Sequence, residues 1–256
     1  MKINAPKSHP RYLSNLYRDK LAYGVKLGIT SLQGLTAHGR GEAFDYLLGE
    51  KTNDFAKIAI KVATCMLITA RHPVISVNGN TAILAPAEII TLANLTNASI
   101  EVNLFHASKK RENNIVHYLK KLGAGTVLLP NKGIIPGIDS NRRMISKEGQ
   151  KDADVILVPL EDGDRTGALV AMGKKVIAID LNPLSRTAKR ANVTIVDNLV
   201  RVIPDLICQV KIMRSYKKEK LISIIDSYDN HLVLEKALIY IARRLTLLSR
   251  NSDVMV

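Results

Sequence analysis

The chain has 256 residues, of which 46% are hydrophobic and 23% are charged. This composition excludes an intrinsically disordered protein, and the length allows one or two domains with a large buried core. Lys and Arg total 37 against 23 Asp and Glu, so the formal net charge is +14. A positive charge of this size favours anionic ligands, but it is equally consistent with a role in solubility alone.

The first seventy residues are predicted to be helical. Apolar residues recur at helical spacing, with a helix start at Ser8 and a stop at Gly28. The next predicted helices cover residues 30–37, 42–48 and 54–71. Between the first two of these, Gly39-Arg-Gly41 is predicted to break the chain into a polar loop, whose glycines would let it approach a phosphate closely.

From residue 73 onward, short apolar strands alternate with helices. The predicted strands cover residues 74–77, 99–103, 126–129, 155–158, 175–179 and 194–196, and the predicted helices between them cover residues 86–94, 108–122 and 166–172. Continuous apolar strands joined by amphipathic helices are typical of a parallel sheet with right-handed crossovers, buried on both faces. We therefore predict an α/β fold: a Rossmann-like parallel sheet with helices on both faces, preceded by a helical N-terminal segment.

Residues 130–149 are expected to be irregular, because Asn, Gly and Pro are frequent there, and the length indicates a functional loop, an interface or structural irregularity alone. After residue 198 two further helices are predicted, over residues 199–218 and 229–248. The second carries an apolar stripe, either core or a subunit interface: Leu234, Leu238, Ile241, Leu245 and Leu248. Residues 1–72, 73–198 and 199–256 are expected to form one compact domain.

The cysteines and the hydropathy pattern are used to predict the cellular compartment. Cys65 and Cys208 lie in apolar helical patterns without CxxC spacing, so we interpret them as core thiols in a reducing compartment. No stretch reaches the ~18 apolar residues of a membrane span, and residues 1–13 lack the apolar core of a signal peptide. We expect a cytoplasmic protein that does not bind membranes.

One pattern occurs twice in the predicted sheet. The run from Val155 ends at Glu161 and leads to Arg165-Thr166, and the run from Val176 ends at Asp180 and leads to Arg186-Thr187. Both the strand starts and the arginines are 21 residues apart, which indicates one strand, turn and helix start built twice in register. Such turns meet at the carboxyl edge of a parallel sheet, where ligands bind, and an Arg there suits a phosphate.

Common phosphate motifs are absent. The sequence contains no GxxxxGK[ST], which argues against a P-loop nucleotidase, and no strand-to-helix GxGxxG. The turn after the first strand reads Ser76-Val-Asn-Gly-Asn-Thr81 instead, where Asn78 and Asn80 flank a glycine and can donate and accept hydrogen bonds. Asparagines are also common in turns because they tolerate left-handed backbone, so this pattern is of moderate specificity.

The turn at Asp180 is the sharper candidate. A carboxylate just past a buried strand can accept hydrogen bonds from ribose hydroxyls, Asn182 can orient a ligand, and Arg186 can clamp a phosphate. The alternative is a plain helix N-cap beside a solvated arginine. Asp197-Asn198 provides a third acidic strand end. No HExxH, paired CxxC or Ser/His/Asp order occurs, so we predict no structural metal and no covalent nucleophile, and we interpret Glu161 and its acidic neighbours as a solvated turn more than as Mg²⁺ ligands.

Several motifs together resemble the archaeal 4-phosphopantoate:beta-alanine ligases, also called phosphopantothenate synthetases. The resemblance covers residues 8–245 and lies in these segments: Ser8-His-Pro-Arg-Tyr12, Gly28-Ile-Thr-Ser-Leu-Gln-Gly34, His38-Gly-Arg-Gly-Glu-Ala-Phe-Asp-Tyr-Leu-Leu-Gly-Glu50, Ser76-Val-Asn-Gly-Asn-Thr81, Pro159-Leu-Glu-Asp-Gly-Asp-Arg-Thr166 and Asp180-Leu-Asn-Pro-Leu-Ser-Arg-Thr187. The stretch Phe105-His-Ala-Ser-Lys-Lys-Arg111 departs from the family pattern, which has a basic residue near Ala107.

The resemblance implies a homodimeric ligase of coenzyme A biosynthesis that joins 4-phosphopantoate to beta-alanine, using ATP with Mg²⁺ and releasing AMP and pyrophosphate through an acyl-adenylate. By the same similarity, ATP would be bound by Arg18, Arg40, Asp180, Leu181, Asn182, Arg186, Thr187, Asp197 and Asn198. Ser76, Asn78 and Asn80 would face the phosphopantoate. Arg186, Asn80 and His38 are the expected catalytic residues, with His38 or Asp180 as candidate base for the amine.

Two other classes of function stay open. A nucleic-acid-binding protein would use the positive charge, but aromatic residues are only 4% and basic residues are scattered, so nucleic acid is not an expected partner. A non-catalytic nucleotide sensor with a Rossmann-like core would bind ATP without releasing pyrophosphate.

Overall fold

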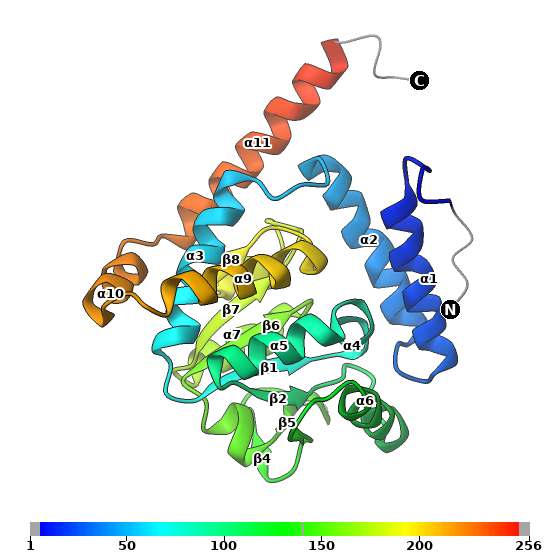
Figure 1. The fold of residues 1–256 in the computed structure, drawn as a ribbon, viewed down its shortest axis with the longest axis vertical. Coiled ribbons are helices and arrows are strands. Elements are labelled where there is room, and N and C mark those ends of the chain that lie inside the picture. The colour runs from blue at the N-terminus through cyan, green and yellow to red at the C-terminus, as the bar shows by residue number, and fades with distance from the viewer. Residues whose placement is uncertain (1–5, 140, 251–256) are drawn as a thin grey trace.

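Six parallel strands form the centre of the molecule (Figure 1). The computed structural model describes residues 6–139 and 141–250; residues 1–5, part of the segment used above to argue against a signal peptide, lie outside the described residues. Across the sheet the order is β3-β2-β1-β6-β7-β8. The bounds are β1 Pro73–Val77, β2 Ser99–Val102, β3 Val127–Leu128, β6 Val155–Pro159, β7 Lys175–Ile179 and β8 Val193–Ile195. The predicted Rossmann-like fold is confirmed.

The strand order creates a switch point between β1 and β6. From β1 the chain moves outward to β2 and β3, then crosses to the other side of β1 and moves outward through β6, β7 and β8. The connections at the carboxyl ends of β1 and β6 therefore leave in opposite directions. In open α/β sheets this divergence opens a crevice in which ligands bind.

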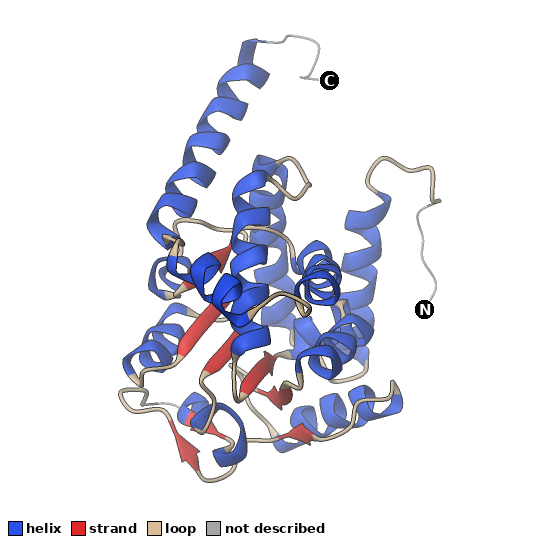
Figure 2. Ribbon diagram, turned by 60° about the vertical axis from the view of Figure 1, so that its left-hand side comes forward, coloured by secondary structure: helices blue, strands red, loops and turns tan. Residues whose placement is uncertain are grey.

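Helices cover both faces of the sheet (Figure 2). Their bounds are α1 Tyr12–Lys26, α2 Leu32–Leu48, α3 Asp54–Thr69, α4 Gly79–Leu84, α5 Pro86–Thr96, α6 Lys109–Lys121, α7 Gly163–Ala171, α8 Arg186–Arg190, α9 Leu199–Met213, α10 Lys218–Asp226 and α11 Asn230–Arg250. Alternate strand residues divide between two apolar clusters. Ile156 and Val176 pack with Leu169 of α7, whereas Leu157 and Ile177 belong to the larger cluster that includes α3, α5 and α9. The larger cluster includes residues of all three predicted segments, and their division stays a prediction.

The predicted break in the N-terminal segment is wrong, because α2 runs without interruption through Gly39-Arg-Gly41. Ser31 caps its start by accepting a hydrogen bond from the Gly34 amide, and Gly49 ends it with a φ of 83°. Leu48, fully buried, fixes the last turn in the core. Packing and caps outweigh the low helix propensity of glycine, because intrinsic helix propensities are weak in comparison with tertiary contacts.

The glycines of α2 give a stability prediction. A Cβ added at Gly39 would meet no atom within 4 Å, so Gly39→Ala should raise the free energy of unfolding by about 0.5–1 kcal/mol by reducing backbone entropy of the unfolded chain. The matched control is Gly34→Ala, whose Cβ would lie 2.6 Å from Asn80 Oδ1 and should destabilise. Urea denaturation of both variants tests this, and equal effects of the two substitutions would contradict it.

Other helix boundaries differ from the predictions. Helix α1 begins at Tyr12, not at Ser8, and α7 begins at Gly163, where the Asp162 side chain caps it. Helix α4 was missed: Asn78, with extended backbone, caps it directly after β1. The helix predicted over residues 199–218 ends at Met213, and α10 follows as a separate helix. The Asp229 side chain accepts from the amides of His231 and Leu232 at the start of α11.

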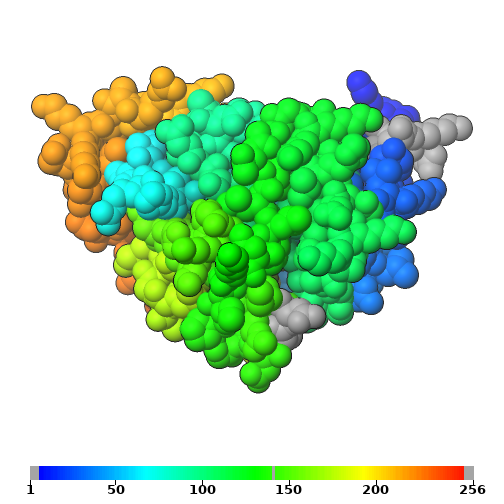
Figure 3. Space-filling model, turned by 90° about the horizontal axis from the view of Figure 1, so that it is seen from below, coloured from blue at the N-terminus to red at the C-terminus, as the bar shows by residue number. Residues whose placement is uncertain are grey.

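Residues 130–149 hold a small antiparallel pair, β4 Gly133–Ile134 and β5 Met144–Ile145, on the surface seen from below in Figure 3. Glu101, at the end of β2 and fully buried, anchors this segment. Its carboxylate accepts hydrogen bonds from Asn103 Nδ2 (3.0 Å), the Ser146 amide (3.0 Å) and the Gln150 amide (2.7 Å). Burial raises the pKa of Glu101, and these hydrogen bonds oppose the shift.

The C-terminal helix leaves much of its apolar stripe uncovered. Leu234 is buried, but Leu238 and Leu245 are 36% and 46% exposed, and the end of α11 projects from the body of the molecule (Figure 1). Within the described monomer Leu234 is core and Ile241 packs against the core, whereas Leu238 and Leu245 stay exposed.

The thiols also differ from the prediction. Cys65 is buried, and desolvation raises its pKa to about 11, whereas Cys208 is exposed because it lies on the outer side of α9. The prediction of two core thiols is therefore wrong for Cys208. Within residues 6–139 and 141–250, none of the helices combines the length and the apolar character that crossing a membrane requires.

Candidate functional site

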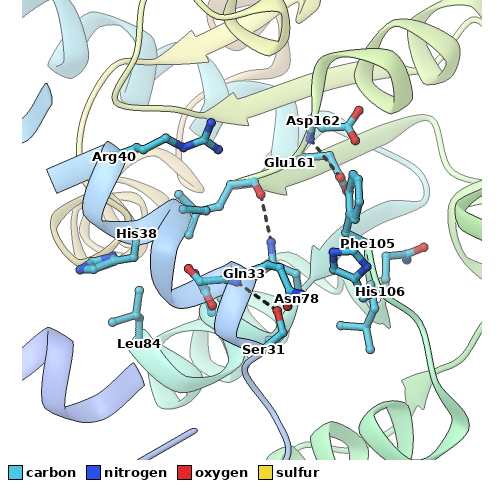
Figure 4. A pocket seen from close by; sticks show the side chains of 18 of the residues that line it. Ser31, Gln33, His38, Arg40, Asn78, Leu84, Phe105, His106, Glu161 and Asp162 are labelled. Atoms are coloured by element: carbon cyan, nitrogen blue, oxygen red, sulfur yellow. Dashed lines mark hydrogen bonds between the residues drawn. The ribbon is translucent and has the colours of Figure 1, made fainter. Parts of the chain in front are cut away.

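A cavity of about 380 Å³ lies at the carboxyl edge of the sheet, over the switch point (Figure 4). Its walls come from α2, the β1–α4 turn, the β2–α6 loop, the β6–α7 turn and the ends of β7 and β8. The lining residues are Ser31, Gln33, Gly34, Ala37, His38, Arg40, Gly41, Asn78, Gly79, Asn80, Leu84, Asn103, Leu104, Phe105, His106, Arg111, Leu160, Glu161, Asp162, Leu181 and Asn198. Figure 4 shows His38 and Arg40 at one side and Phe105 and His106 at the opposite side.

Asn78 joins the two strands of the switch point. Its Nδ2 donates to the carbonyl oxygens of Pro159 and Leu160, both at 3.1 Å, while its Oδ1 accepts from the amide and hydroxyl of Thr81. Asn80 acts similarly between helices, since its Nδ2 donates to the Gly34 carbonyl at 2.8 Å. Both asparagines line the cavity and hold its walls together.

Helix α2 contributes a cation and a neutral imidazole. The Arg40 side chain is exposed and makes no hydrogen bond or ion pair with the described residues, so its five N–H donors are available to a ligand. His38 is half-buried, and burial lowers its pKa below the ordinary value of 6.5, opposed by the Glu42 carboxylate. At pH 7 the imidazole is therefore neutral and can accept a proton.

Arg18 lies outside the cavity lining, on α1. Its Nε and Nη2 donate to Glu42 Oε2 at 3.0 and 2.8 Å. Burial favours protonated Glu42, but hydrogen bonds from Ser14, Arg18 and Tyr46 outweigh it and lower the pKa of this carboxyl. The ion pair ties α1 to α2.

The two Arg-Thr turns are not built in register, contrary to the sequence-based prediction. Val155 pairs with Lys175 across β6 and β7, an offset of 20, whereas the helix starts Gly163 and Arg186 are 23 apart, so the second turn has three extra residues. Arg165 is 2% exposed; its Nη2 donates to Gln150 Oε1 at 2.5 Å and its Nη1 lies 3.4 Å from Glu161 Oε2. Arg165 therefore holds the carboxylate of Glu161, a lining residue of the cavity, through an ion pair.

The turn after β7 forms its own hydrogen-bonded unit, of which only Leu181 lines the cavity. Asp180 accepts from the Asn182 amide at 2.9 Å and from Ser185 Oγ at 2.5 Å, and burial raises its pKa. Ser185 caps α8. Arg186, the first residue of α8, is 66% exposed and pairs with Asp164 at 2.7 Å.

Thr187 and the β8 end connect neighbouring turns. The Thr187 hydroxyl donates to the Glu161 carbonyl at 2.9 Å, which links α8 to the β6–α7 turn. Asp197, 1% exposed, accepts from Thr52 Oγ1 at 2.6 Å and from Arg201 Nε at 2.8 Å. Asn198 caps α9 and donates to Asp45 Oδ2 at 2.7 Å.

The structure brings together part of the predicted set. The predicted residues that line the cavity are His38, Arg40, Asn78, Asn80, Leu181 and Asn198. Those that lie around it without lining it are Arg18, Ser76, Asp180, Asn182, Arg186, Thr187 and Asp197. Ser76, in β1, is buried and accepts from Gln150 Nε2 at 3.2 Å.

Sequence reasoning missed one group that lines the cavity and one buried group behind it. One is Arg111, with Phe105 and His106, from the stretch that departs from the family pattern; the only signal was its position after a strand and a Ser108 cap. The other is Gln150, whose role follows only from the tertiary contacts of its amide. Among the described residues, no three His, Cys, Asp or Glu side chains form a group that could hold a metal ion.

The fold and the cavity define a Rossmann-like α/β protein whose site, lined by arginines and amides, lies at the switch point of the sheet. Its residues 55–244 match the family model described as phosphopantothenate/pantothenate synthetase. The chain belongs to this family and is an enzyme of the ligase class.

Curated relatives agree over most of their length. The chain is 48% identical to the 4-phosphopantoate--beta-alanine ligase of Thermococcus kodakarensis over 97% of this chain and 96% of that protein. It is 51% identical to the protein of the same name from Methanosarcina mazei, over 91% of this chain and 92% of that protein. The corresponding protein of Thermococcus onnurineus is 49% identical over 97% and 96%.

Proposed function

We propose that this enzyme condenses 4-phosphopantoate with beta-alanine to 4'-phosphopantothenate in coenzyme A biosynthesis, using ATP and releasing AMP and pyrophosphate. The observation that carries the proposal is identity of about half the residues, over nearly the full length, to relatives named for this reaction. The switch-point cavity, with an unpaired Arg40 and a neutral His38, supplies a site of fitting chemistry.

ATP is proposed to bind across the β7 and β8 ends. Asp180, Leu181 and Asn182 would hold the nucleoside, with Asp197 and Asn198 on the next turn; the Asp197 carboxylate is already occupied by Arg201. Arg18, Arg40, Arg186 and Thr187 would bind phosphate oxygens. Of these three arginines, Arg40 alone has no carboxylate partner among the described residues; Arg18 and Arg186 would exchange their carboxylate partners for phosphate.

Mg²⁺ is proposed to enter with the triphosphate. The acidic residues of the β6–α7 turn are already engaged, since Asp164 pairs with Arg186 and Asp162 contacts Arg142. A cation coordinated mainly by phosphate oxygens and water fits this donor set better than one held by a protein cage.

The reaction would proceed in two displacements. The carboxylate of 4-phosphopantoate attacks the α-phosphorus of ATP, so that a carbon–oxygen–phosphorus linkage forms and pyrophosphate leaves. The amine of beta-alanine then attacks the acyl carbon, AMP leaves and the nitrogen loses a proton. Asn78 and Asn80 would orient the acid, with Ser76 beneath them, and neither step requires a nucleophilic side chain. Positioning of the reactants can supply roughly 7–11 kcal/mol of the barrier reduction.

His38 is proposed as the base that takes the amine proton, and this gives a pH prediction. Because burial lowers its pKa, the imidazole stays neutral down to a pH below 6.5, and kcat should fall only as the pH decreases through that lowered value. His38→Gln should reduce kcat by roughly 10²-fold or more and remove this acidic limb. A kcat profile from pH 5 to 8 tests it. A variant with an unchanged profile would exclude His38 and leave Asp180 as the candidate.

A direct assay tests the proposed function. AMP formation should require 4-phosphopantoate, beta-alanine and ATP together, and unphosphorylated pantoate should be a poor replacement. ATP binding without pyrophosphate release would favour the nucleotide sensor instead. Salt-dependent retention of nucleic acid in a gel shift would favour the third class.

The enzyme is also proposed to be a homodimer. The exposed apolar side chains along α11, such as Leu238 and Leu245, offer a surface that a second copy could cover. Sedimentation analysis of the wild type would contradict this proposal if it showed a monomer at micromolar concentrations.

A further inference from the structure

Arg111 places an incompletely bonded guanidinium at the cavity. Its Nη1 donates to the His106 carbonyl at 2.6 Å and its Nη2 to the Ile29 carbonyl at 3.0 Å. Its Nε is buried and has no partner among the described residues. A Cβ at Gly79 would lie 3.2 Å from Arg111 Nη2, so the group stands beside the β1–α4 turn that forms part of the cavity wall.

The charge of Arg111 is uncompensated, unlike that of comparable arginines. Arg165, Arg201 and Arg142 are also withdrawn from water, and each lies against a carboxylate. Within residues 6–139 and 141–250, no Asp or Glu pairs with Arg111, and burial alone lowers its pKa. A cation partly removed from water with only neutral acceptors is costly unless an anion arrives from outside.

The sheet topology separates this cation from the proposed nucleotide site. Arg111 follows β2, whereas the residues proposed for ATP follow β7 and β8. Strands β1 and β6 lie between β2 and β7, which makes three strand spacings, or roughly 14 Å. The cavity therefore has a cationic wall on each side of the switch point, one at Arg111 and one at Arg40.

Building on the proposed function, we propose that Arg111 binds the phosphate monoester of 4-phosphopantoate. This substrate carries a phosphate at one end and the reacting carboxylate at the other. With the phosphate at Arg111, the carboxylate points toward Asn78 and the crevice, where the α-phosphorus of ATP would meet it. Ser31, two residues after Ile29, uses its oxygen to accept from the Gly34 amide and keeps its proton to donate to the same phosphate.

The site explains selection of the phosphorylated acid. Pantoate lacks the phosphate group that would pair with the guanidinium. When pantoate binds, Arg111 would therefore stay without an anionic partner, as in the free enzyme. Hydrogen bonds between charged groups are stronger than those between neutral groups, so a paired guanidinium and phosphate discriminate strongly.

The test compares Arg111→Met with Lys110→Met, which removes the same charge from an exposed neighbour on α6. Isothermal titration calorimetry would measure the Kd of 4-phosphopantoate, pantoate and ATP for each variant and the wild type. Arg111→Met is expected to weaken 4-phosphopantoate binding by about 10–100-fold. Its Kd for ATP and for pantoate should stay within threefold of the wild type, and Lys110→Met should leave all three constants within threefold.

Three results would overturn the proposal. Equal weakening of 4-phosphopantoate binding and pantoate binding would show that Arg111 has a structural role. Weakening of ATP binding alone would assign Arg111 to the nucleotide. An unchanged affinity for 4-phosphopantoate would remove the site while the proposed function stood. If the wild type itself failed to bind 4-phosphopantoate, the proposed function would fall as well. Should Arg111→Met not fold by circular dichroism, Arg111→Lys provides the same comparison, with an expected loss of about 3–30-fold because lysine keeps the charge without the fork.

Discussion

Arg186→Ala is expected to remove nearly all ligase activity while leaving the fold intact. The proposed role of Arg186 is to clamp the triphosphate, and loss of its charge-assisted hydrogen bonds should lower kcat/KM for ATP by at least about a hundredfold. The side chain is 66% exposed and its one ion pair, with Asp164, is on the surface. Removing such a pair should change the free energy of unfolding by less than about 1 kcal/mol.

Arg190→Ala is the matched control. Arg190 lies one turn further along α8, contacts the same Asp164 oxygen at 3.4 Å and is also exposed. The two variants therefore lose the same carboxylate partner, and only Arg186 belongs to the proposed nucleotide site. Steady-state kinetics with varied ATP separate them. If both variants kept full activity, the phosphate role of Arg186 would be wrong, and equal losses would point to Asp164 as the group that matters.

The largest expected stability effect belongs to Glu101→Ala. This substitution leaves three donors without their acceptor: Asn103 Nδ2 and the amides of Ser146 and Gln150. Each buried group that loses its partner costs about 1–3 kcal/mol, so we expect a loss of about 3–5 kcal/mol in the free energy of unfolding. Gln150 also bonds Arg165, which supports Glu161 at the cavity, so ligase activity should fall as well.

Glu101→Gln removes the negative charge of the side chain but keeps one oxygen that can accept hydrogen bonds. With its oxygen in the place of Oε1, the glutamine amide still accepts from Asn103 Nδ2 and the Ser146 amide, and only the Gln150 amide loses its acceptor, so the destabilisation should be about half that of alanine. Urea denaturation at pH 7 measures both variants against the wild type. A change below 1 kcal/mol in Glu101→Ala would show that water replaces the carboxylate and that this anchor contributes little.

The sheet could be predicted from the sequence because each central strand is a short, continuous apolar run bounded by polar turns. Val155–Pro159 and Lys175–Ile179 show this directly, and the predicted bounds differ from the observed ones by at most one residue. The register between them could not be predicted. It depends on how two strands meet in space, and the three extra residues in the turn after β7 are not evident from the spacing of the arginines.

The site was predictable where its residues sit in strand-end turns, as Asn78 and Asn80 do. Arg111 and Gln150 escaped prediction because their partners are distant in sequence: Arg111 bonds a carbonyl 82 residues away, and Gln150 bonds a hydroxyl 74 residues away. Helix α2 escaped because its glycines are overruled by caps and by the burial of Leu48. Local sequence patterns do not indicate contacts between residues that are so far apart in the sequence.

The contrast between the two thiols makes the molecule convenient for spectroscopy. A maleimide reagent at neutral pH should modify Cys208 on the outside of α9 and spare Cys65, whose proton is held and whose sulfur is covered. One nitroxide per polypeptide could thus be attached without any engineered substitution. In the proposed homodimer, the distance between the two spin labels would then report the relative placement of the subunits, with and without bound substrates.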